Sequence, residues 1–169
     1  FERSCLVTPM LFSAFIFGFL SAILALVLEI ILIPSESFPQ VTALSWSVRS
    51  MLLLIGVAFI EESSKYLFLS RYLLQFSENA VTVSQKIFLG ALFGLGFGSL
   101  ELTLAYYGTR FSQIDTWFFG IVFLHIATSL ILVAFLHRFQ NVRNKFLLPI
   151  LVATLTHLLY NVLLSFILS

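Results

Sequence analysis

Runs of about 20 mainly apolar residues, separated by short polar segments, divide this chain and have the length of a helix that crosses a bilayer. Within each run the apolar residues are continuous rather than alternating with polar ones. This excludes a transmembrane barrel, because barrel strands alternate between residues that face lipid and residues that face the lumen. The sequence therefore predicts an all-α fold, a polytopic bundle of transmembrane helices.

Composition supports this class. Hydrophobic residues make up 60% of the chain, charged residues make up 10%, and the mean hydropathy is +1.06. Soluble globular proteins lie far from these values, so the expected environment is the lipid bilayer. A net charge of +1 offers no basic patch for nucleic acid, and no nucleic-acid partner is expected. Cys5 is the single cysteine, which excludes an internal disulfide.

Five transmembrane helices are expected, in a single transmembrane domain over residues 1–169. Their predicted ranges are 6–33, 50–69, 87–107, 117–136 and 146–168. The first run is longer than the core of a signal peptide, so we interpret it as a retained helix. Because the chain begins with Phe1, we interpret it as a fragment or a processed form.

Basic residues between the helices predict the orientation, because cytoplasmic loops carry an excess of lysine and arginine. Two of them, Arg49 and Arg110, fall on one side of the membrane. The six on the other side are Arg3, Arg71, Lys86, Arg138, Arg143 and Lys145. The N-terminus is therefore predicted inside and the C-terminus outside.

Three charged residues, Glu61, Glu62 and Lys65, lie in the middle of the second apolar run. Each costs roughly 3 kcal/mol at the centre of a membrane helix, so their presence calls for a reason. A structural ion pair is one interpretation, but one lysine cannot neutralise two carboxylates. Glu61 and Lys65 are four residues apart and share a helix face, whereas Glu62 is turned by about 100°.

Other polar residues lie at a similar depth in the remaining helices. At 1.5 Å per residue, Glu61, Glu101, His125 and His157 each lie roughly 14–18 Å from a polar end of their helix. A row of small residues precedes Glu101 on the same side of its helix and predicts close packing against a neighbour; its members are Gly90, Gly94 and Gly98. We therefore expect the four polar residues to converge in one layer.

Two glutamates and two histidines on facing helices could hydrolyse a peptide bond in either of two ways. In the first, Glu61 or Glu62 is the general base, while His157 and Asn161 donate hydrogen bonds to the oxyanion. In the second, a divalent metal such as zinc activates the water. Its candidate ligands are His125, His157 and Glu101.

At these residues the chain resembles a known family. Residues 61–65 match the pattern E-E-x-x-K, and residues 97–101 match F-x-x-x-E. His125 stands alone in the next helix, and residues 157–161 match H-x-x-x-N. This ordered series resembles the PrsW family of intramembrane proteases, which is related to the CAAX-protease and bacteriocin-processing group.

The resemblance covers residues 50–167 and implies an intramembrane endopeptidase of the bacterial cytoplasmic membrane. It implies membrane-bound protein substrates, of which anti-sigma factors are the best-known type. The family is often described as metalloproteases, yet the related group is also described as glutamate-dependent, so both chemical versions stay open. The implied active-site set is Glu61, Glu62, Glu101, His125 and His157, with Asn161 in support.

Two other functions use the same residues. An ion- or proton-coupled transporter would place buried ionisable groups along a conduction path, which predicts residues spread across depth. A non-catalytic membrane scaffold would keep the fold without the chemistry. The ordered motif set and the shared depth favour the protease over both.

Overall fold

The computed structural model describes residues 2–33, 48–75, 81–108, 117–138 and 146–168. Over these ranges the chain forms five α-helices and no strand, which confirms the all-α prediction. They are α1 (Glu2–Leu32), α2 (Val48–Leu74), α3 (Val83–Gly108), α4 (Trp117–Arg138) and α5 (Leu147–Leu168). Each predicted run corresponds to one of these helices. Three basic residues used to predict the orientation lie outside the described residues: Arg110, Arg143 and Lys145.

Four helices, α1, α3, α4 and α5, are long and apolar enough to cross a membrane, as a multi-pass membrane protein requires. Helix α2 has sufficient length, 27 residues, but carries Glu61, Glu62 and Lys65 in its middle. All three of these side chains are buried. That α2 is a fifth membrane-crossing helix therefore stays a prediction. The other helices of the bundle shield its three charged side chains.

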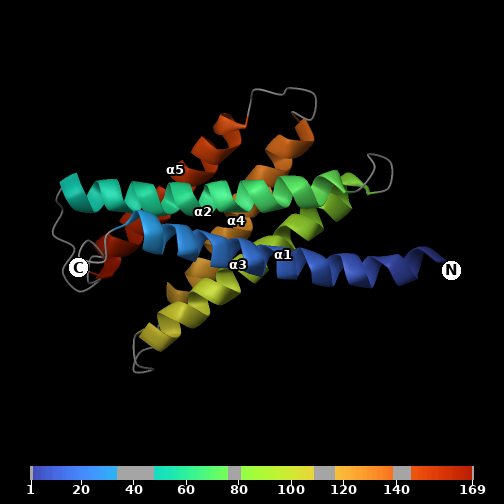
Figure 1. Cartoon of the computed structure of the whole chain (residues 1–169), viewed down its shortest axis with the longest axis horizontal. Helices are drawn as coiled ribbons and strands as arrows, with labels where there is room; N and C mark the ends of the chain where they lie inside the picture. Colours follow the sequence, from blue (N-terminus) through green and yellow to red (C-terminus); the bar gives the residue numbers. More distant parts are fainter. Residues whose placement is uncertain (1, 34–47, 76–80, 109–116, 139–145, 169) are drawn as a thin grey trace.

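Figure 1 shows α1 and α2 side by side and running in opposite directions, while α3, α4 and α5 cross them obliquely. Helix α3 packs most extensively on α4 and α1, and α2 also contacts α5. An apolar core joins four of the helices through Leu69, Phe93, Leu132, Val133 and Ala153. This core begins one helical turn beyond Lys65 on α2, so it supports the polar centre from one side.

Glycines allow α3 to lie against its neighbours at backbone distance. A Cβ atom added at Gly96 would overlap the carbonyl oxygen of Phe15 on α1, and one added at Gly94 would lie 2.5 Å from the carbonyl oxygen of His125 on α4. Because these neighbours are backbone atoms, they could yield only if a whole helix moved. Small residues thus set the distance between α3 and α4 at the level of His125.

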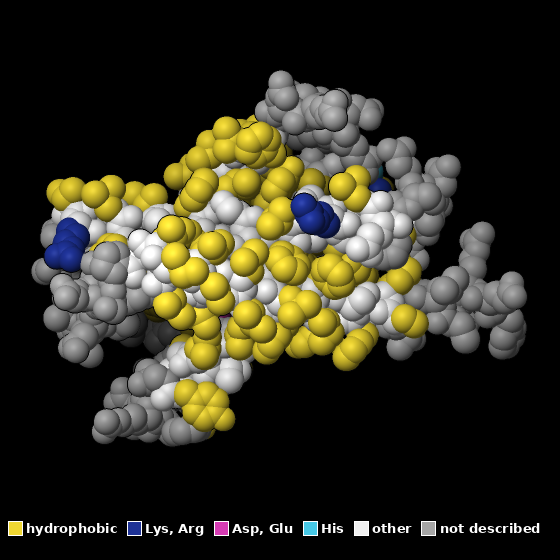
Figure 2. Space-filling view, in the orientation of Figure 1, with side chains coloured by type: hydrophobic (Ala, Val, Ile, Leu, Met, Phe, Trp, Pro, Cys, Tyr) yellow, Lys and Arg dark blue, Asp and Glu magenta, His cyan; other side chains and the backbone are white. Residues whose placement is uncertain are grey.

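The face shown in Figure 2 is covered mainly by hydrophobic side chains, with a few basic ones. Over all described residues, Phe12, Ile31, Leu52, Phe123 and Leu155 are among the most exposed hydrophobic side chains. Large apolar side chains of this kind are suited to contact with lipid tails rather than water. The charged side chains in the middle of α2 are buried instead.

Candidate active site

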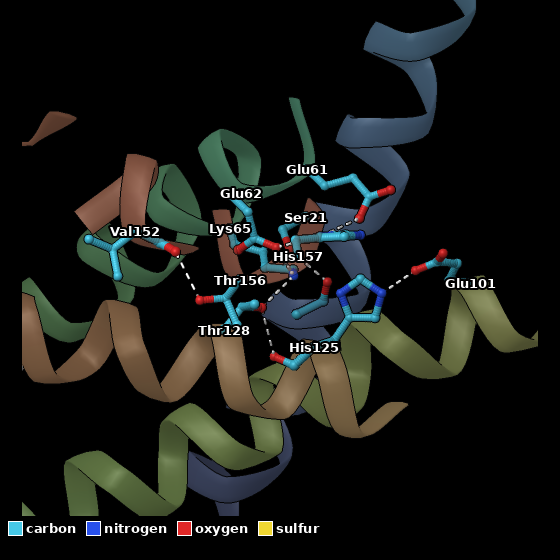
Figure 3. A network of polar contacts seen from close by, with 11 residues as sticks. Ser21, Glu61, Glu62, Lys65, Glu101, His125, Thr128, Val152, Thr156 and His157 are labelled. Atoms are coloured by element: carbon cyan, nitrogen blue, oxygen red, sulfur yellow. Dashed lines mark hydrogen bonds and ion pairs between the residues drawn. The ribbon is translucent and has the colours of Figure 1, made fainter. Parts of the chain in front are cut away.

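Three helices bring four ionisable side chains together in the interior of the bundle. Glu61 and Glu62 come from α2, His125 from α4 and His157 from α5. One nitrogen or carboxylate oxygen from each lies within 4.8 Å of the others, and all four residues are at most 6% exposed. Figure 3 shows these side chains converging from facing helices. Residues far apart in the sequence therefore form one buried polar centre.

The carboxylate of Glu62 is held by two donors on the same oxygen. Its Oε1 atom lies 2.7 Å from Lys65 Nζ and 2.9 Å from His157 Nδ1. A carboxylate can only accept, so Nδ1 of His157 carries a proton and donates; in the neutral ring the lone pair is then on Nε2. Within the described part of the chain, Glu62 Oε2 is buried and has no hydrogen-bond partner.

The neighbouring carboxylate of Glu61 is held much less firmly. Its Oε2 atom lies 3.7 Å from His157 Nδ1, which is beyond hydrogen-bond distance. This oxygen is also buried without a hydrogen-bond partner among the described residues. Two adjacent glutamates thus have different environments, because their side chains leave the helix about 100° apart.

His125 is oriented by a carboxylate from α3. Its Nε2 atom forms a short hydrogen bond with Glu101 Oε2, and its ring packs against Phe97 with centroids 4.6 Å apart. The other ring nitrogen, Nδ1, is buried and has no partner among the described residues. The rings of His125 and His157 meet edge to face, with centroids 5.4 Å apart.

Lys65 completes the centre with an ammonium group that is fully buried. Besides Glu62, Nζ contacts the Thr128 hydroxyl of α4 at 2.9 Å and lies 4.5 Å from the centre of the Phe97 ring. The positive charge is therefore compensated by a carboxylate, a hydroxyl and an aromatic face.

Comparison with known proteins agrees with this geometry. Residues 7–169 match the model of the PrsW family intramembrane metalloproteases. The chain belongs to the PrsW family. No curated protein and no solved structure matches it. Because the PrsW match covers nearly the whole chain, the protein is an intramembrane protease and hence a hydrolase whose substrates are membrane proteins.

The donor set fits the metal that the description of the PrsW family implies. Seven buried side-chain atoms lack hydrogen-bond partners among the described residues, and four of them are hydroxyl oxygens. The other three are of metal-ligand type: Glu61 Oε2, Glu62 Oε2 and His125 Nδ1. His125 and His157 each use their other nitrogen on a carboxylate, as ligating histidines commonly do.

The formal charge of the site also suits a bound divalent cation. With the histidines neutral and all three carboxylates of Glu61, Glu62 and Glu101 ionised, the single ammonium of Lys65 leaves a formal charge of two negative. A divalent cation would cancel this charge in a region where uncompensated charge is costly.

Two predicted residues lie apart from the group of four. Glu101 contacts His125 from outside, and its side chain is 37% exposed, so it marks the more open edge of the centre. Asn161 is half-buried, one helical turn beyond His157. Sequence reasoning missed the contact between Thr128 and Lys65. Its only signal was the position of Thr128, three residues after His125 on the same face.

Proposed function

We propose that this PrsW protein hydrolyses peptide bonds of membrane-bound proteins at the buried centre, with Glu61 as the general base. The observation that carries this is the Oε2 atom of Glu61, which is buried without a hydrogen-bond partner among the described residues. It lies in one group with Glu62, His125 and His157. A general base must be able to take up a proton from water, and a carboxylate oxygen without a donor can do so.

Glu62 is less suited to that task. Its Oε1 atom already accepts from Lys65 and His157, and a proton placed on this carboxylate would weaken both charge-assisted contacts. We therefore assign Glu62 to the binding and orientation of neighbouring groups. Lys65 and His157 keep this carboxylate in place while Glu61 receives and returns the proton.

The residues proposed to hold the metal are Glu62, His125 and His157, which leaves Glu61 as the base. A divalent metal such as zinc would supply a Lewis acid that polarises the peptide carbonyl and makes water more acidic. Glu101 would then fix the ring of His125 through Nε2, and Asn161 is proposed as a supporting donor to the oxyanion.

Substrate is proposed to enter laterally from the bilayer, at the edge where Glu101 is partly exposed. The substrate class that we propose from the family resemblance is the membrane-anchored protein of anti-sigma-factor type, in a bacterial cytoplasmic membrane. A transporter is less well supported, because the ionisable groups are gathered within 4.8 Å rather than spread along a path.

Cleavage of a labelled transmembrane substrate in proteoliposomes tests this proposal. We expect the wild type to cleave and Glu61→Gln to cleave roughly 10²–10⁴-fold more slowly, because the amide side chain cannot act as a base. Glu78→Gln, which changes a carboxylate between α2 and α3 in the sequence, serves as the control. Normal cleavage by Glu61→Gln would overturn the assignment of the base, and proton flux without cleavage would favour the transporter.

A further inference from the structure

The Thr128 hydroxyl on α4 differs in its contacts from three other hydroxyl residues of these helices. Thr156, Ser99 and Thr103 each donate to a carbonyl of their own helix, at distances of 3.0, 2.7 and 2.7 Å. In contrast, the Thr128 hydroxyl lies 3.4 Å from the His125 carbonyl, which is a weak geometry. Its closer contact is across helices, as the acceptor for Lys65 Nζ at 2.9 Å.

This contact meets a need of the lysine. An ammonium has three N–H donors, and a buried donor without an acceptor is costly. Glu62 Oε1 satisfies one donor and Thr128 Oγ1 another, while the Phe97 face lies 4.5 Å from the nitrogen. Both Lys65 and Thr128 are fully buried. Water is therefore poorly placed to replace the hydroxyl.

Through Lys65 the hydroxyl is also connected to Glu62. Lys65 contacts Oε1 of this carboxylate, whereas Oε2 is buried without a hydrogen-bond partner among the described residues. If the ammonium moved, the carboxylate could rotate and follow it. Figure 3 shows this chain of contacts running from Thr128 through Lys65 and Glu62 to His157.

We propose that Thr128 is a positioning residue: its hydroxyl holds the ammonium of Lys65 against Glu62 and so keeps the second carboxylate oxygen directed into the site. This rests on the proposed function of that site. It links α4, which carries His125, to the glutamates of α2 through side chains rather than through backbone packing.

The test compares Thr128→Val with Thr128→Ser in the proteoliposome assay. Valine keeps the shape but removes the acceptor, and we expect kcat to fall roughly 10–100-fold with little change in KM. Serine keeps the hydroxyl, so the kcat of Thr128→Ser should lie within about threefold of the wild-type value. The control is Thr156→Val, which removes a hydroxyl that donates to the Val152 carbonyl of its own helix, and it should leave kcat unchanged.

Zinc retention gives a readout that does not depend on turnover. Against a competing chelator we expect Thr128→Val to bind zinc roughly tenfold more weakly than Thr128→Ser. Thr128→Ala takes its place if the valine variant fails to fold. Equal kcat and equal zinc affinity in the hydroxyl-free and serine variants would overturn the proposal.

Glu61→Gln separates this inference from the proposed function. If Glu61→Gln is inactive while Thr128→Val is normal, the positioning role alone is wrong. If Glu61→Gln is fully active, the proposed function of the site fails, and the inference about Thr128 fails with it.

Discussion

His157 distinguishes between two adjacent glutamates: its Nδ1 atom lies 2.9 Å from Glu62 Oε1 but 3.7 Å from Glu61 Oε2. One carboxylate is therefore fixed by a hydrogen bond and the other is not. Lys65 adds to the difference because its short contact also goes to Glu62 Oε1. Neighbouring residues of the same type can thus do different work in one site.

Removing the charge of Glu62 should destabilise the protein. Glu62→Gln leaves the buried ammonium of Lys65 without a carboxylate, and we expect a loss of about 3 kcal/mol in the free energy of unfolding. Glu62→Gln/Lys65→Met removes both charges and should recover most of that stability without recovering cleavage. Thermal unfolding in detergent measures both. If Glu62→Gln alone were as stable as the wild type, that result would contradict a stabilising buried ion pair.

Alanine substitutions at two glycines should have different effects, because one glycine is tightly packed beside the site and the other is not. At Gly98 an added Cβ would lie 2.9 Å from Val122 Cα and 3.3 Å from His125 Cδ2, whereas at Gly56 it would meet nothing within 4 Å. We expect Gly98→Ala to lower kcat by on the order of a hundredfold, because α4 must shift and carry His125 with it. Gly56→Ala should change the free energy of unfolding by less than about 0.5 kcal/mol. Equal activities of the two variants would show that α4 tolerates the displacement.

Glu101 should act through His125. Glu101→Ala removes the acceptor that orients the ring, and we expect zinc affinity and kcat to fall roughly 10–100-fold. Glu101→Gln keeps an oxygen that can accept from Nε2 and should lose less. Zinc competition and cleavage assays rank the zinc affinity and the kcat of the wild type, Glu101→Gln and Glu101→Ala. If both variants lose all activity alike, Glu101 must take part in the reaction itself.

Much of the fold could be predicted because membrane helices leave a simple record in sequence. Runs of apolar residues predicted the all-helical class and one helix for each run. Depth was also accessible, since a constant rise per residue relates Glu61, His125 and His157 to the ends of their helices. Those three residues lie in one group in the structure.

The rotation of each helix about its own axis could not be predicted from the sequence in this way. Depth alone could not say that Glu101 contacts His125 from outside while Glu62 enters the group of four. That arrangement depends on how closely α3 and α4 approach at Gly94 and Gly98. The Thr128 contact depends on the rotamer of Lys65, which no spacing rule predicts.

The most direct test of a single metal-dependent hydrolytic site is a zinc titration of metal-stripped protein, with bound metal and substrate cleavage measured on the same samples. We predict that cleavage rises with bound zinc and levels off at about one ion per chain. The His125→Ala/His157→Ala double variant should neither bind the ion nor cleave. Full cleavage by wild-type protein that holds no metal would contradict the account.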